Sequence, residues 1–251
     1  MTASLAAFLA LVVLGTSFLS GVFGMAGGLV LLGALLLVFD VAPAQILFGA
    51  TQFASNGWRA VLWRAHVRWD IVWRYVAGSL AAFAAMGLVA FIPDKGWMYV
   101  GLGATPFLVR LLPKSLDPDI ERPGAPYLCG AVIMVTQLLA GAAGNVLDLF
   151  FQRSSLDRKA IVATKAVTQT AAHALRVAYF GAFAEAFAQP LPWWVFAGAI
   201  AIAMLGNTLA ARVLHAMSDA GFRRWSWRII AAVSLTYLAR GLWMVVTGST
   251  T

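Results

Sequence analysis

Hydrophobic residues run almost without interruption from the start of the chain to Phe39, and the first charged residue is Asp40. As one continuous helix this run would be roughly 55 Å long, whereas the hydrocarbon core of a bilayer is about 30 Å thick. Four glycines lie within the segment 20–28, and glycine both weakens a helix interior and tolerates unusual backbone angles. The pattern therefore predicts two shorter helices that meet at a glycine-rich turn inside the membrane.

Two interpretations of this glycine-rich stretch are open at the level of sequence. A broken helix at membrane depth is tolerated where protein buries it or where it lines a wet cavity, and many transporters build a substrate site in this way. Small residues also allow two helices to pack closely, as in Gly-x-x-x-Gly contacts. The segment is therefore either part of a site or a packing contact.

The rest of the chain alternates between hydrophobic segments and short polar connectors. In the first half this alternation predicts membrane spans at about 43–63, 71–92 and 97–112. In the second half it predicts another long apolar run at 127–151, followed by spans at about 159–183, 191–214 and 227–246. The longest polar connector, 113–126, divides the chain into an N-terminal transmembrane repeat, residues 1–112, and a C-terminal one, residues 127–251.

The placement of positive charge assigns each connector to one side of the membrane. Lysine and arginine collect in four connectors that the positive-inside rule places in the cytoplasm: 64–74, 114–122, 153–159 and 212–228. The connectors near Asp40, Asp94 and Glu185 are nearly free of cations and are expected outside. The run 127–151 then has a cytoplasmic connector at both ends. It must enter the membrane and return, with its turn near Gly141–Gly144.

Each half is thus predicted to be a re-entrant helical hairpin followed by three transmembrane helices, with both chain termini outside. Three spans is an odd number, so the second half is inverted relative to the first. Weak internal similarities occur in the same order in both halves: Gly21-x-x-Gly24 with Gly141-x-x-Gly144, Ala50-Thr-Gln52 with Ala163-Thr-Lys165, and Arg110 with Arg240. The predicted fold is an all-α polytopic membrane protein built from two inverted repeats.

The composition supports a membrane protein and excludes several other classes. Hydrophobic residues make up 61% of the 251 residues and charged residues 11%, whereas a soluble domain has about 25% charged residues. The net charge of +8 follows from the cytoplasmic connectors, so we expect a lipid bilayer and no nucleic acid as partner. Cys129 is the single cysteine, and we expect no cofactor and no metal ion. The sequence leaves open whether the chain forms a homo-oligomer.

An ordered set of short motifs along nearly the whole chain resembles the sulfite exporter TauE/SafE family of membrane transporters. The motifs are Phe18-Leu-Ser-Gly-Val-Phe-Gly-Met-Ala-Gly-Gly28, Ala50-Thr-Gln with Asn56, His66-Val-Arg-Trp-Asp70, Gly141-Ala-Ala-Gly144, Ala163-Thr-Lys-Ala166, Ala172-His173 and Gly221-Phe-Arg-Arg224. The resemblance implies a secondary transporter of the inner (plasma) membrane. It implies export of a small anion by alternating access, with sulfite, sulfoacetate and other organosulfonates as the expected substrates.

Two other function classes are alternatives to a carrier. An anion channel would use the same cavity without alternating access. An intramembrane enzyme would need a catalytic constellation, and the sequence contains no His-Glu-x-x-His, no Gly-x-Ser-x-Gly and no phosphate loop that ends in Gly-Lys-Ser/Thr.

The helices that follow the two hairpins carry polar residues at helical spacing. Gln52, Asn56 and Arg59 share one face of the first helix, and Lys165, Gln169, His173 and Arg176 share one face of the second. Charges so far into a span usually face a cavity or a partner. We therefore expect a small anion to bind between the hairpin turns, with the predicted site residues Gly24, Gln52, Asn56, Gly144, Asn145, Lys165, Gln169, His173 and Arg240.

The roles of several of these polar residues have alternatives. Arg59 and Lys165 either face the cavity or extend along the helix toward the lipid headgroups. Asp148 is a proton carrier, a salt-bridge partner or a residue at headgroup level, and His173 is a second candidate for proton exchange. Arg240 either pairs with Asp148 or binds the substrate.

Overall fold

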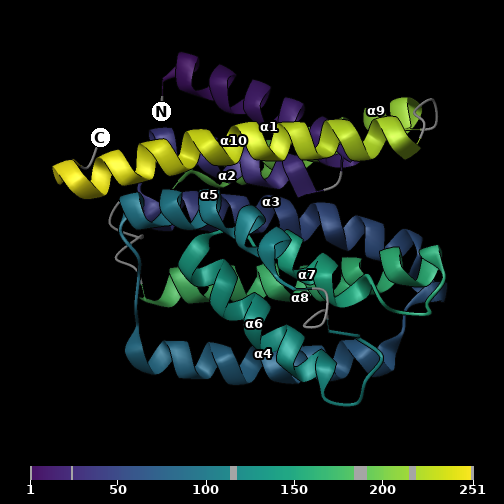
Figure 1. The fold of residues 1–251 in the computed structure, drawn as a ribbon. Helices are drawn as coiled ribbons and strands as arrows, with labels where there is room; N and C mark the ends of the chain where they lie inside the picture. The colour runs from purple at the N-terminus through teal and green to yellow at the C-terminus, as the bar shows by residue number, and fades with distance from the viewer. Residues whose placement is uncertain (1, 24, 114–117, 184–190, 215–218, 250–251) are drawn as a thin grey trace.

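The structure, a computed structural model, describes residues 2–23, 25–113, 118–183, 191–214 and 219–249. Over these residues the chain is all-helical, with ten α-helices, one short 3-10 helix and no strand (Figure 1). The predicted all-α fold class is confirmed.

The helices follow the predicted segments closely. In the first half they are α1 (Ala3–Phe23), α2 (Met25–Val38), α3 (Val41–Leu62), the 3-10 helix η1 (Arg64–His66), α4 (Trp69–Val89) and α5 (Lys95–Leu111). In the second half they are α6 (Ala125–Ala140), α7 (Gly144–Phe151), α8 (Arg158–Phe183), α9 (Trp193–Leu214) and α10 (Asp219–Thr247). The long apolar run that opens each half is split into two helices, at the glycines that predicted the break.

Four of the described helices are long and apolar enough to cross a membrane, and these are α1, α4, α9 and α10. Helices α2 and α6 are apolar but shorter. The hydrophobic pattern also predicted spans at α3, α5 and α8. Helix α5 has 17 residues and is shorter than the four candidate spans, whereas α3 and α8 have the length but not the hydropathy, because they carry the polar faces described above. The two helices that follow the hairpins are therefore long enough to cross a membrane but too polar to count among these candidate spans.

Both chain ends lie at the same end of the molecule, at the left of Figure 1. Most helices run between this end and the opposite one, whereas α6 lies obliquely (Figure 1). The connectors before α4, before α6 and before α8 lie at the opposite end. The predicted placement of both termini on one side of the protein agrees with this arrangement.

The second apolar run forms the predicted hairpin. The backbone N–H of Ile120, which precedes α6, donates to the carbonyl of Phe150 near the end of α7 over 2.9 Å. The chain therefore turns back to the end from which it came. The turn lies at Gly141, which follows α6 with a φ of 76°, a left-handed conformation that favours glycine.

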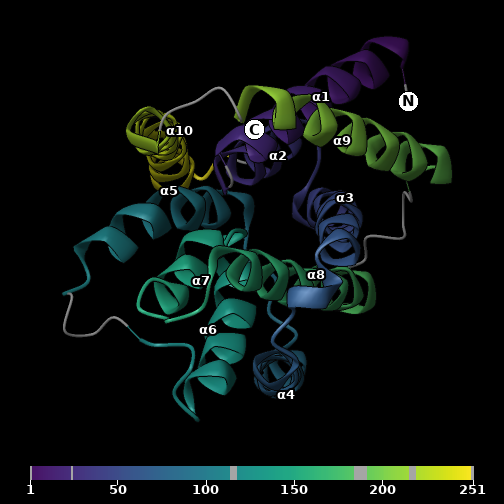
Figure 2. The same cartoon turned by 90° about the vertical axis from the view of Figure 1, so that its right-hand side faces the viewer.

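Close packing joins the two halves of the chain. The main pairs between them are α1 with α9, α3 with α8, α4 with α6 and α5 with α10. Gly78 and Gly130 allow α4 and α6 to approach closely, because a Cβ at either position would collide with the backbone of the facing helix. Helices α3 and α8 lie between α1 and α9 on one side and α4 on the other (Figure 2).

The largest buried apolar cluster lies toward the end that carries the termini. It includes the first two turns of α3, the middle of α2 and the last two turns of α8, where Tyr179 and Phe180 are fully buried. The Tyr179 hydroxyl donates to the carbonyls of Met86 and Phe91, at 3.2 and 2.9 Å. This end of the molecule is therefore filled by side chains.

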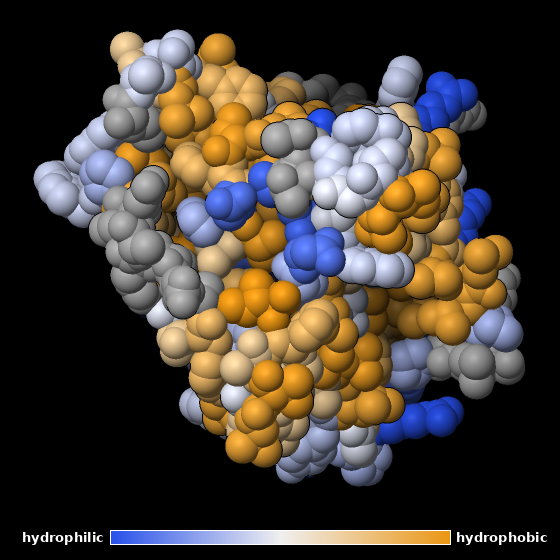
Figure 3. Space-filling view, turned by 90° about the vertical axis from the view of Figure 1, so that its left-hand side faces the viewer, coloured by the Kyte–Doolittle hydropathy of each residue, from blue (hydrophilic) through white to orange (hydrophobic). Residues whose placement is uncertain are grey.

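The end face that carries the termini is shown in Figure 3. Hydrophobic residues cover much of it, and hydrophilic residues gather near its middle and at parts of its rim. Among the polar contacts of this end is an ion pair over 3.5 Å between Lys95, which opens α5, and Asp40, which precedes α3. Acidic and basic groups here are few, in agreement with the low cation content of these connectors.

Candidate functional site

A cavity of about 410 Å³ lies between α3, α8 and the two hairpins. Ser20 and Gly28 line it from the first hairpin, and residues 142–145 line it from the turn of the second. Its long walls are α3, from Phe48 to Arg59, and α8, from Ile161 to Arg176. Both hairpins and both polar helices therefore meet at one place.

Seven of the nine predicted site residues line this cavity, and they are Gln52, Asn56, Gly144, Asn145, Lys165, Gln169 and His173. Gly24 lies outside the described residues. Arg240 does not line the cavity, and its guanidinium stands 5.3 Å from the ring centre of Tyr99 on α5. Of the two alternatives for Arg240, pairing with Asp148 is wrong, because the carboxylate of Asp148 binds Lys165.

The first glycine-rich stretch has features of both interpretations that the sequence left open. Gly28 lines the cavity, and a Cβ there would stand 3.4 Å from the amide nitrogen of Gln52. Gly27 lies at a packing contact, because a Cβ there would collide with the backbone of Thr16 and Ser20 on α1. Neighbouring glycines thus divide the two roles.

Lys165 is held by an acid from the second hairpin. Its ammonium group donates to the carboxylate of Asp148 on α7, and each side chain is about one quarter exposed, at 23% and 27%. This pair ties α7 to α8. Asp148 therefore balances the positive charge of Lys165, and the donation of a hydrogen bond from Lys165 to a bound anion stays a prediction.

Arg176 has no carboxylate partner in the described part of the chain. Its side chain is 1% exposed and lines the cavity. One terminal nitrogen, Nη2, donates to the carbonyl of Gly141 over 2.8 Å and to the side-chain oxygen of Gln137 over 3.3 Å. The remaining nitrogens, Nε and Nη1, are buried without a hydrogen-bond partner, and the group lies over the ring of Phe48 at 4.8 Å.

His173 lies one turn from Arg176 on the same wall. It is 7% exposed, lines the cavity and has an Nδ1 atom without a hydrogen-bond partner. Its ring meets that of Phe48 edge to face, with 5.6 Å between the ring centres. Arg176 and His173 thus present unused polar nitrogens on one short stretch of the cavity.

Other polar residues of the cavity are positioned by their own helices. The amide nitrogen of Asn56 donates to the carbonyl of Gln52 one turn earlier, over 2.9 Å. Gln137 on α6 donates to the carbonyl of Ala172 over 2.9 Å, which fixes its oxygen toward Arg176. The amides are therefore oriented rather than free to rotate.

The charge of the cavity is unbalanced. Its lining contains the cations Arg59, Lys165 and Arg176 and one carboxylate, that of Asp148. A cation removed from water without a partner is unfavourable by several kcal/mol, so the lining favours the entry of an anion. Among the described residues there is no group of three or more His, Cys, Asp or Glu side chains that could hold a metal ion.

The cavity is not centred along the helices. On α3 it begins at Phe48, seven residues or about 10 Å from the first residue of the helix, and reaches Arg59, three residues or about 5 Å from the last. On α8 it runs from Ile161, three residues from the start, to Arg176, seven residues from the end. Fewer helical residues therefore separate the cavity from the end with the basic connectors than from the opposite end. This shorter stretch is the thinner wall of the cavity.

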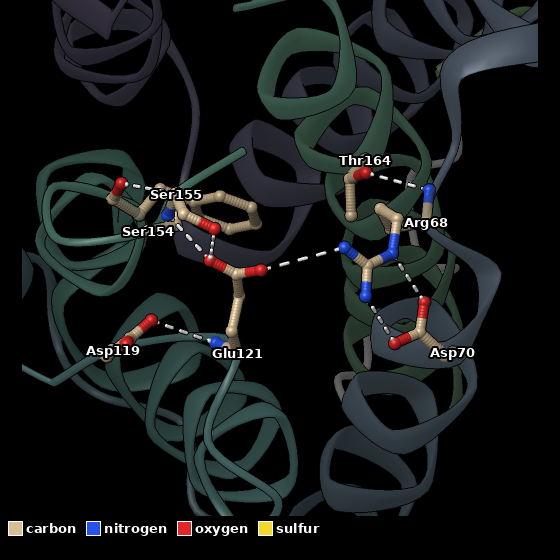
Figure 4. Close-up of polar contacts among 8 residues, drawn as sticks. Arg68, Asp70, Asp119, Glu121, Ser154, Ser155 and Thr164 are labelled. Carbon is tan, nitrogen blue, oxygen red and sulfur yellow. Dashed lines mark hydrogen bonds and ion pairs between the residues drawn. The ribbon is translucent and has the colours of Figure 1, made fainter. Parts of the chain in front are cut away.

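A polar network connects the two halves of the chain at that end (Figure 4). Arg68 forms two 2.9 Å hydrogen bonds with Asp70 and an ion pair of 3.6 Å with Glu121. Glu121 accepts hydrogen bonds from the backbone and side chain of Ser155, and the backbone N–H of Arg68 donates to Thr164 over 3.0 Å. The hydrogen bonds that Arg68 donates to the Asp70 carboxylate raise the pKa of the Arg68 guanidinium above its ordinary value. The connectors before α4, α6 and α8 are thereby held together.

The structure adds cavity residues that the predicted site did not include. Arg59 and Arg176 belong to the polar helix faces recognised in the sequence, and their spacing could have placed both of them in the site. Gln137 is one of two amides in the apolar run 127–151, with Asn145, and a polar residue at such depth is itself a signal of function. No signal in the sequence predicts the contact of Phe48 with Arg176.

Comparison with known proteins gives one family match. A family model described as "Sulfite exporter TauE/SafE" matches residues 8–237, a range that contains every residue of the cavity. Neither curated proteins nor solved structures give a match.

Proposed function

Because this chain belongs to the TauE/SafE sulfite exporter family, we propose that it is a secondary transporter that carries a small sulfur-containing anion out of the cell. The expected substrates are sulfite, sulfoacetate and other organosulfonates. The family is one of membrane exporters, and the transporter is proposed to perform no chemical reaction on its substrate. It would act in the inner (plasma) membrane with both termini outside.

The observation that carries this proposal is the charge of the cavity. Three cations face one carboxylate, and the most deeply buried cation, Arg176, has no carboxylate partner among the described residues. Burial of an unpaired guanidinium is unfavourable for a protein that has no use for it. An anion that enters the cavity supplies the missing charge.

The helix pairing supports alternating access by two related halves. If α1–α5 are matched in order with α6–α10, the pair α1 with α9 corresponds to the pair α6 with α4. Under the same matching, the pairs α3 with α8 and α5 with α10 correspond to themselves. Arg110 on α5 lies 4.1 Å from the ring centre of Trp227 on α10, and Arg240 on α10 lies 5.3 Å from that of Tyr99 on α5. An inverted repeat would produce these reciprocal contacts.

The position of the cavity supports loading from the cytoplasm. Its thinner wall lies toward the end that carries the basic connectors, and buried apolar residues fill the other end. Under the positive-inside rule the basic end is cytoplasmic. The described conformation would then be the one that takes up the substrate before export.

The experiment that tests the proposal uses purified protein in liposomes. Vesicles loaded with sulfite or sulfoacetate should release the anion faster with the protein than without it. Unlabelled anion on one side should also drive uptake of labelled anion from the other side. Release without this counterflow would show a channel, and no release of either anion would reject the proposed substrates.

A further inference from the structure

We propose that Arg176, together with His173, is the deep binding site for the oxyanion group of the substrate, and that Lys165 is not one of its ligands. The inference rests on the proposed function and specifies where in the cavity the anion is held. The group that fits is a compact sulfite or sulfonate head, whose several oxygens can each accept a hydrogen bond.

The first argument is the supply of unused hydrogen-bonding groups. Arg176 has two buried nitrogens without a partner, and His173 has one. Buried polar atoms in proteins nearly always have a partner, so three orphans on neighbouring turns indicate a ligand. Lys165 differs, because the carboxylate of Asp148 already balances its charge and Lys165 is not among the buried groups without a partner.

The second argument is distance. Lys165 and Arg176 are eleven residues apart on α8, which places their Cα atoms about 16 Å apart along the helix axis and on the same face. At that spacing a compact oxyanion head is expected to contact one of the two side chains rather than both. The two cations therefore mark separate positions along the cavity, and Arg176 is the one farther from the thin wall.

The third argument is that Arg176 is held rigidly where a bound anion would affect the second hairpin. Phe48 covers one face of the guanidinium, and Nη2 holds the carbonyl of Gly141 at the turn between α6 and α7. A planar guanidinium fixed in this way loses little further entropy when it binds an oxyanion. The same side chain would thus bind the substrate and hold the end of the broken helix.

The chain offers a matched control for Arg176. Arg240 also has a buried Nε without a partner and also lies over an aromatic ring, but it does not line the cavity. Arg176→Gln and Arg240→Gln therefore remove similar groups in similar surroundings. Only the first of them removes a cation of the proposed site.

The test is calorimetric titration of the purified protein in detergent with sodium sulfite and, separately, with sulfoacetate. Arg176→Gln should weaken binding by roughly 10- to 100-fold, as expected for the loss of a charge-assisted hydrogen bond. Arg240→Gln should bind as the wild type does. His173→Gln leaves the buried cation in place and should weaken binding by a smaller factor, so it carries the test if Arg176→Gln does not fold.

Three results would overturn the assignment. One is wild-type affinity in folded Arg176→Gln, and the second is wild-type affinity in folded His173→Gln. The third is an equal loss of affinity in Arg240→Gln. In each of these cases release of anion by wild-type protein in liposomes would leave the proposed function standing. If wild-type liposomes release neither anion, the proposed function and this site are both wrong.

Discussion

The ion pair between Lys165 and Asp148 allows a sharp test of where the anion lies. Lys165→Gln alone leaves a carboxylate without its partner, and Asp148→Asn alone leaves an ammonium group without its partner. Loss of one partner of a fully buried pair is destabilising by about 3–5 kcal/mol. These side chains are 23% and 27% exposed, so we expect less. The double variant Lys165→Gln/Asp148→Asn removes both charges and avoids that penalty.

The expected change in anion affinity follows from the distance between the two positions. With the anion at Arg176, the Cα spacing of about 16 Å serves as the separation between the Lys165 charge and the anion, and it corresponds to roughly 1 kcal/mol at an effective dielectric constant of about 20. Lys165→Gln should then weaken binding about fivefold. Asp148→Asn should strengthen it by a similar factor. In the double variant the two effects oppose each other, and the affinity should stay within about twofold of the wild type.

Direct contact of the anion with Lys165 predicts a different outcome. A charge-assisted hydrogen bond contributes about 1.5–3 kcal/mol, so its loss would weaken binding at least tenfold in both the single and the double variant. Calorimetric titration with sulfite, together with thermal unfolding of each variant, measures both quantities. A folded double variant that loses more than about tenfold in affinity would refute the placement of the anion at Arg176.

Three further predictions concern the fold. Gly141→Ala should lower stability by about 1–3 kcal/mol in thermal unfolding, because the φ of 76° is strained for alanine and the new Cβ would stand 2.7 Å from a methyl carbon of Leu32. Cysteines placed singly at Ser154 and Tyr127, in a background without Cys129, should be labelled from the same side of the membrane. In the Asp157→Asn variant the free energy of unfolding should fall less steeply toward low pH than in the wild type. The reason is that the backbone N–H groups of Ala160 and Lys159 hold the pKa of the Asp157 carboxyl below its ordinary value.

Each of these predictions has a control or a contradicting result. Gly198→Ala on α9 introduces a methyl group with no atom within 4 Å and should not destabilise the protein. Equal losses of stability in Gly141→Ala and Gly198→Ala would contradict the explanation by backbone strain at Gly141. Labelling of the two cysteines from opposite sides would contradict the second hairpin. For Asp157 the lowered pKa means that its stabilisation is present above about pH 4 and is lost as the pH falls through the folded value. A wild-type advantage over Asp157→Asn that grows toward low pH would contradict this sign.

Much of the fold could be predicted because the signals are local. Runs of hydrophobic residues located most helices within a few residues, and glycines in those runs located both breaks. The start of α10 was predicted wrongly, because the helix begins at Asp219 and its polar first turns lie within the predicted connector 212–228. Cations in alternate connectors required the apolar run 127–151 to turn back. The hydrogen bond between Ile120 and Phe150 joins the segment just before this run to its end, so the chain does turn back. The inverted relation of the halves and the side of the membrane on which the termini lie stay predictions.

The candidate site was predicted in part. Helical spacing grouped the polar residues of α3 and α8 on single faces, and the fold brings those faces to one cavity. Spacing could not tell Lys165 from Arg176, since both lie on the same face at similar apparent depth. Spacing also did not show that Arg240 lies outside the cavity, because a lone arginine in a span carries no sign of its neighbours and its contact with Tyr99 comes from another helix.

The sequence by itself determined the class of the protein, because hydropathy, glycine breaks and charge asymmetry each act within one segment of the chain. Only the tertiary structure decided which cation is already paired. Asp148 reaches Lys165 because the second hairpin brings α7 against α8, whereas Phe48 on α3 and Gln137 and Gly141 at the end of α6 surround Arg176 from two other parts of the chain. A charge finds its partner through space rather than along the chain, and that pairing determines which group is left to bind an anion.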